Sequence, residues 1–153
     1  MSKGHWREKA TRDGQKAATL QQFHAVYVYG PLDGRPAKIG IAENPNKRCH
    51  GIQGGYWQPC KIWRYWWTLG RVMAYRLEQC ILSDHSEVRL TGEWLNLGAE
   101  ELMARVEPTA ARLRIRLFDD EEAVRLAFAY SRSEQTTKNM RYFHSGLENR
   151  KHL

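Results

Sequence analysis

The sequence predicts one domain of the α/β kind, more closely α+β, with strand-like segments mostly before residue 70 and helices mostly after it. Its 153 residues match the usual size of a single domain, and a composition of 42% hydrophobic and 27% charged residues is that of an ordinary globular chain. No apolar stretch approaches the about 18 residues of a membrane span, and the three cysteines form no C-x-x-C pair. We therefore expect a cytoplasmic protein without a membrane partner.

A hairpin and a helix are predicted first. Residues 24–29 are β-branched and aromatic, residues 30–36 are rich in Gly and Pro, and a second short run covers residues 38–41. Asn44 stands directly before Pro45, which is the pattern of a capped helix start, and this helix should continue to Gln53.

The remaining elements follow from the same signals. The aromatic run at 61–68 predicts a third strand, and apolar residues at helical spacing predict a helix over 71–84. A short extended piece is expected within 91–97. Two amphipathic helices fit residues 99–113 and 121–130.

The excess of basic residues lies in both ends of the chain and in its central block, residues 23–97. Lys and Arg number 24 against 17 Asp and Glu, for a net charge of +7. We expect a basic arm at 1–22, a main domain at 23–97, a helical extension at 98–130 and a basic tail at 131–153. This excess favours a polyanionic partner, because each Lys or Arg placed on a phosphate releases counterions.

Residues able to do chemistry occur in a recognisable order. Tyr27 is followed after eleven positions by Lys38, which opens Lys38-Ile39-Gly40, and Arg48 follows ten positions later. Further along come Leu77-Glu78 and Gly92-Glu93-Trp94. Over residues 23–97 this order resembles the GIY-YIG endonuclease superfamily, within it the branch with K-I-G in the second motif and a downstream G-E-W.

The resemblance implies a small three-stranded antiparallel central sheet flanked by helices, with the active site on one face. It also implies phosphodiester hydrolysis assisted by one divalent ion, Mg²⁺ or Mn²⁺. Tyr27 matches the tyrosine that acts as general base, Arg48 the catalytic arginine and Glu78 the metal-binding glutamate. Lys38 departs from the tyrosine that most members have there, and Leu82 stands where this branch often has a histidine.

These residue types suit the reaction in physical terms. A tyrosine accepts a proton near neutral pH only if its pKa falls well below about 10, and a cation within about 4–6 Å lowers it. We expect the hairpin to set Lys38 beside Tyr27 for this purpose. Arg48 offers a fork of donors that matches phosphate, and a site of one carboxylate, such as Glu78, with waters and substrate oxygens is typical of Mg²⁺.

Two further residues complete the predicted catalytic set. Tyr29 should share the face of Tyr27, and His50, two residues after Arg48, should assist at the scissile phosphate. DNA, taken as duplex, is the expected partner, and targeting is left to the tails or to a protein partner. The predicted nucleic-acid contacts are Lys47, Arg48, Lys138 and Arg141.

Each of these residues also has a structural interpretation. The tyrosines fit a half-buried strand face, Lys38 an edge strand, Glu78 a solvated helix face and Glu93 a structural contact. The tryptophans at 57, 63, 66 and 67 suit a core, although an exposed one could stack on a base. The alternative function is a catalytically inactive nucleic-acid-binding or protein-interaction module on the same fold.

Overall fold

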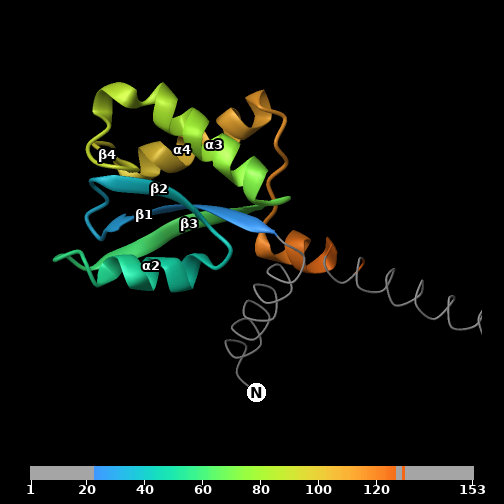
Figure 1. Ribbon diagram of the computed structural model, residues 1–153, viewed down its shortest axis with the longest axis horizontal. Helices are drawn as coiled ribbons and strands as arrows, with labels where there is room; N and C mark the ends of the chain where they lie inside the picture. Colours follow the sequence, from blue (N-terminus) through green and yellow to red (C-terminus); the bar gives the residue numbers. More distant parts are fainter. Residues whose placement is uncertain (1–22, 127–128, 130–153) are drawn as a thin grey trace, which may run out of the picture.

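The computed structural model describes residues 23–126 and residue 129 (Figure 1). The named elements are β1 (His24–Pro31), β2 (Ala37–Ala42), α2 (Pro45–Gln53), β3 (Cys60–Thr68), α3 (Arg71–Asp84), the 3₁₀ turn η1 (Ser86–Val88), β4 (Trp94–Leu95) and α4 (Ala99–Arg112). Residues 120–126 are also helical. The predicted arm, the basic tail with Lys138 and Arg141, and most of the span beyond 126 lie outside the described residues.

A mixed α+β fold is confirmed, with one strand more than predicted. The strand order is β3-β1-β2-β4, and every neighbouring pair is antiparallel. The fourth strand pairs Leu95 with Ala37 and Trp94 with Lys38. Two residues are too few to show the alternation that marks a strand in sequence, so only an extended piece could be expected there.

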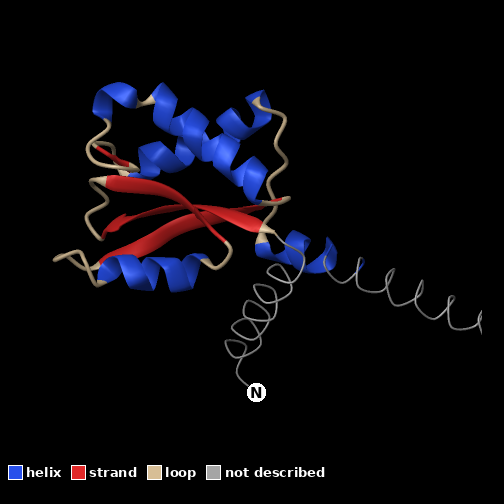
Figure 2. Ribbon diagram, in the orientation of Figure 1, coloured by secondary structure: helices blue, strands red, loops and turns tan. Residues whose placement is uncertain are grey.

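The sheet divides the helices into two layers (Figures 1 and 2). Successive strand residues point to opposite faces. On one face Val26, Val28 and Ile39 pack into the main hydrophobic core beneath α3 and α4. On the other face Tyr27 and Tyr29 pack with residues of α2.

Residues 98–126 complete this core and share it with residues 23–97. Side chains of α4, among them Leu102 and Val106, join the main cluster. Phe118 forms two backbone hydrogen bonds with Trp67, of 2.8 and 2.9 Å, and packs in a second cluster with Phe23 and Ala123. Within the described part of the chain, no helix has the length and apolar character needed to cross a bilayer.

The start of α2 follows the predicted cap. The side chain of Asn44 accepts a hydrogen bond from the backbone N–H of Lys47 at 3.1 Å, and Pro45 opens the helix. This fixes α2 across the sheet face that carries the two tyrosines, with Cys49 as its buried contact. Arg48, one residue earlier, is exposed.

Candidate active site

Tyr27 lies directly over Gly40. The hairpin register pairs these two residues, and a Cβ added at Gly40 would stand 2.5 Å from both Cζ and Oη of Tyr27. Atoms cannot approach that closely, so only glycine leaves room for the ring. Tyr27 is buried, with 1% of its surface exposed. The Gly of Lys38-Ile39-Gly40 therefore has a steric role in placing the phenol.

The electrostatic surroundings of Tyr27 differ from those expected. Burial raises the pKa of its phenol well above the ordinary 10, and the charge and hydrogen bond of Arg48 offset only part of that rise. Lys38 is not among the groups that shift the Tyr27 pKa. The prediction that Lys38 lies beside Tyr27 and lowers its pKa is wrong, because the register places Lys38 opposite Tyr29.

Lys38 instead forms an ion pair with Glu93. Its Nζ lies 2.5 Å from Oε2 of Glu93, and the side chains are 7% and 44% exposed. A buried ammonium needs a counter-charge, and Glu93 supplies it from the loop before β4. The hydrogen bond and charge of Lys38 hold the pKa of the Glu93 carboxyl below its ordinary value.

Glu78 is a buried carboxylate on α3, with 6% of its surface exposed. Its Oε1 accepts a hydrogen bond of 3.1 Å from the side chain of Gln79, and among the described residues it has no ion pair. Burial raises its pKa. A buried carboxylate without a paired cation fits a divalent ion, with waters and substrate oxygens as the other ligands, since the described residues hold no cluster of three His, Cys, Asp or Glu.

Glu93 links these residues into one group. Its charge acts on both Tyr27 and Glu78, while Arg48 acts on Tyr27 and on Glu93 itself. Its backbone C=O accepts from the N–H of Ile39 at 3.1 Å, which holds the loop against the outer edge of β2. The sequence suggested a structural role for Glu93, and only its place in the G-E-W motif indicated that it could belong to the site.

A cavity of about 620 Å³ borders this group on the α2 side. Arg48 and Lys47 line it together with Ile41, Ala42, Glu43, Asn44 and Gly51. Both cations are exposed. The cavity therefore offers a phosphate a route to Arg48, whose guanidinium also contacts Tyr27.

Tyr29, which is paired with Lys38 in the sheet, and His50 line a second and smaller cavity. The hydroxyl of Tyr29 donates to Oε1 of Gln53 at 3.3 Å, and His50 lines a cavity of about 230 Å³ with Tyr29, Gln53 and Lys61. Residues two apart on a helix point about 200° apart, so α2 directs His50 and Arg48 to different sides. Gln53 was not singled out from the sequence, where an isolated glutamine gives no signal.

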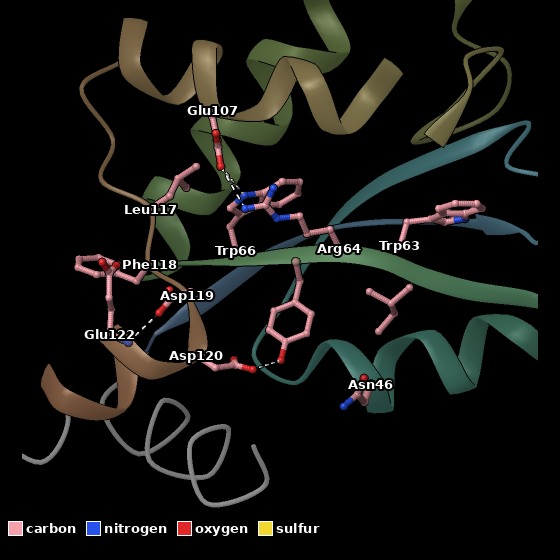
Figure 3. Close-up of a pocket in the computed structure, with 12 residues that line it drawn as sticks. Asn46, Trp63, Arg64, Trp66, Glu107, Leu117, Phe118, Asp119, Asp120 and Glu122 are labelled. Atoms are coloured by element: carbon pink, nitrogen blue, oxygen red, sulfur yellow. Dashed lines mark hydrogen bonds and ion pairs between the residues drawn. The ribbon is translucent and has the colours of Figure 1, made fainter. Parts of the chain in front are cut away.

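Another cavity, of about 550 Å³, opens at the outer edge of β3 (Figure 3). Asp120 there accepts hydrogen bonds of 2.7 Å from Tyr65 and from Trp67, and Glu107 pairs with Arg64 at 3.1 Å. Four carboxylates line this cavity, and they would repel a phosphate: Glu107, Asp119, Asp120 and Glu122. We do not place the candidate site here.

Comparison of the chain with protein-family models, with curated proteins and with solved structures finds no match.

Proposed function

We propose that this protein is a metal-dependent endonuclease of the GIY-YIG kind that hydrolyses phosphodiester bonds in DNA. The observation that carries the proposal is the grouping of Tyr27, Lys38, Arg48 and Glu78 around Glu93. These residues come from β1, β2, α2 and α3, and the same four were named by the resemblance. The exposed cation Lys47 beside Arg48 adds support for an anionic substrate.

Glu78 would hold the divalent ion, Mg²⁺ or Mn²⁺. The ion, when bound, supplies positive charge for the phosphoryl oxygens and the departing oxyanion. Arg48 acts on the same phosphate with its fork of donors, and this charge stabilisation needs no further rearrangement because α2 already holds the guanidinium beside Tyr27.

Tyr27 takes the proton of the attacking water at its Oη in this proposal. Because burial raises the pKa of the phenol, phenolate is scarce at neutral pH, and the rate should climb into the alkaline range. Lys38 is a positioning residue here: it neutralises and holds Glu93, whose charge acts on both Tyr27 and Glu78.

Duplex DNA is the proposed substrate. Lys47 lies next to Arg48 on the exposed side of α2 and would contact the backbone, as would the tail residues Lys138 and Arg141. Such contacts give affinity without sequence preference.

The variant Glu78→Gln tests the proposal, with nicking of supercoiled plasmid in Mg²⁺ as the assay. We expect no measurable nicking and DNA affinity within a few-fold of the parent. The variant should also melt higher, because it removes a charge that burial disfavours, so unfolding cannot explain the loss. Mn²⁺ should raise the melting temperature of the parent only.

Glu107→Gln is the matched control, since Glu107 is exposed on α4 and pairs with Arg64, which is not a residue of the candidate site. It should nick like the parent. Full Mg²⁺-dependent activity in Glu78→Gln would reject the assignment of the metal ligand. A parent protein that binds DNA but never nicks it would instead favour the inactive binding module.

A further inference from the structure

Trp57 is the most exposed large apolar side chain among the described residues, at 86% exposed. It lies in the loop between α2 and β3, which extends beyond the end of the helix (Figure 2). A single exposed apolar residue is common on protein surfaces. Trp57 differs from such residues in the structure of the loop that carries it.

The side chain of Gln53 fastens both flanks of Trp57. Its Nε2 donates to the backbone C=O of Tyr56 at 3.3 Å and of Gln58 at 2.8 Å, and its Oε1 accepts from the N–H of Cys60 at 2.7 Å. Holding a loop in one conformation reduces the entropy lost when it binds a partner. Trp57 is therefore presented to solvent by a fixed loop.

Aromatic contacts connect this loop to the candidate active site. Tyr56 stacks on Trp94, with ring centroids 5.2 Å apart and planes 13° apart. Trp94 in turn meets Tyr29 edge to face at 6.3 Å, pairs with Lys38 in the sheet, and directly follows Glu93. The loop and the catalytic group are thus joined through β4.

Polar groups of both signs lie near the loop, since Lys61 lines the cavity at its base and the charge of Asp33 acts on Tyr56. The cavity of about 230 Å³ at its base is lined by His50 and Lys61 and by no carboxylate. Exposed Gly55 and Pro59 flank the tryptophan. A single exposed aromatic side chain near Lys61, which lies over the ring of Trp63, matches a nucleotide strand better than a protein interface, whose buried centre is a contiguous apolar patch.

We propose that Trp57 stacks on an unpaired base of the DNA strand bound at the candidate active site. Bases inside a duplex have both faces covered by their neighbours, so the substrate class favoured by this residue is DNA with a flap, bubble or single-strand junction. This inference rests on the proposed function and adds the preferred substrate structure to it.

Binding is measured on the full-length chain carrying Glu78→Gln, without divalent ions, so that no cleavage occurs. The two probes are a duplex and the same duplex with a flap that contains 2-aminopurine. Trp57→Ala should weaken flap binding by about 5- to 100-fold, which is what losing one base stack costs, and leave duplex binding nearly unchanged. Trp57→Phe should retain most of the affinity and the quenching of 2-aminopurine.

Leu69→Ala is the matched control, because Leu69 is 62% exposed and follows the far end of β3. It should alter neither probe. The slope of log affinity against log salt should stay the same in Trp57→Ala, because no phosphate contact is lost. Equal flap and duplex affinities in the parent would overturn the inference, as would a flap preference that survives Trp57→Ala. Either result would favour a protein partner for Trp57 instead.

The two proposals fail separately. Nicking that depends on Glu78, together with flap binding that ignores Trp57, would leave the nuclease standing and remove the stacking role. Flap binding that depends on Trp57, in a parent protein that never nicks DNA, would keep the stacking role and remove the nuclease.

Discussion

The two faces of the central sheet are built from the same strands but have different roles. Beneath α3 and α4, β1 and β2 present Val26, Val28 and Ile39, all fully buried in hydrocarbon. Towards α2 the alternating positions present Tyr27 and Lys38, which are also buried but carry polar atoms. Period-two alternation lets one face stabilise the domain while the other holds groups whose burial costs free energy.

Neighbouring residues on β2 give the sharpest test of this division. Ile39→Ala should lower the free energy of unfolding by about 2–5 kcal/mol, because it opens a cavity in the core. Its activity per folded molecule should stay near that of the parent. Lys38→Met should have the opposite effect. Activity should fall because Glu93 loses its partner, while the free energy of unfolding should change little because the apolar side chain fills the same volume. Urea unfolding and nicking rates on both variants decide the matter, and equal stability losses would contradict the division.

Arg48 carries the next largest expected effect, on the tyrosine face. Arg48→Lys keeps the charge but loses the planar fork, so turnover should fall on the order of 100-fold with little change in DNA affinity. Single-turnover rates and binding curves separate the two quantities. Lys47→Ala, one residue earlier in the same cavity, should weaken affinity with turnover kept. Loss of affinity alone in Arg48→Lys would make Arg48 a positioning contact.

The fold was largely predictable because its signals are local. The bounds of α3 coincide with the predicted 71–84, and Asn44-Pro45 marked the start of α2 correctly. The candidate site was less predictable from the sequence. Lys38 meets Glu93, 55 positions away, and Tyr27 faces Gly40; both depend on the hairpin register and on a two-residue strand that leaves no pattern in the sequence.

Gly40→Ala probes the close approach that the register creates. The added methyl would stand 2.5 Å from Tyr27 Oη, so the ring must move, and overpacking of this kind costs about 1–3 kcal/mol. Activity should fall as well, because the phenol leaves Arg48. Gly51→Ala is the control: nothing lies within 4 Å of its added Cβ, and alanine inside a helix should raise stability by about 0.5–1 kcal/mol. An active, stable Gly40→Ala would show that Tyr27 has room to spare.

The smallest effect concerns two carboxylates of the candidate site, Glu78 and Glu93, whose pKa values move in opposite directions from 4.5. The lowered pKa of Glu93 means that the unfolded chain binds more protons near pH 4, so its contribution to stability is present above about pH 4.5 and lost as pH falls. The raised pKa of Glu78 means that its contribution is present below about pH 4.5 and lost as pH rises towards neutrality.

Unfolding free energies between pH 3 and pH 7, measured without divalent ions, should show this opposition. Glu93→Gln should destabilise the protein at pH 7 and flatten the acid limb, by less than about 1 kcal/mol because the group is partly exposed. Glu78→Gln should stabilise it at pH 7. The charge of Glu93 raises the pKa of Glu78, so the double variant should differ from the sum of the single variants. Shifts of the same sign in both single variants would show that Glu78 is not the unpaired buried charge on which its role as metal ligand depends.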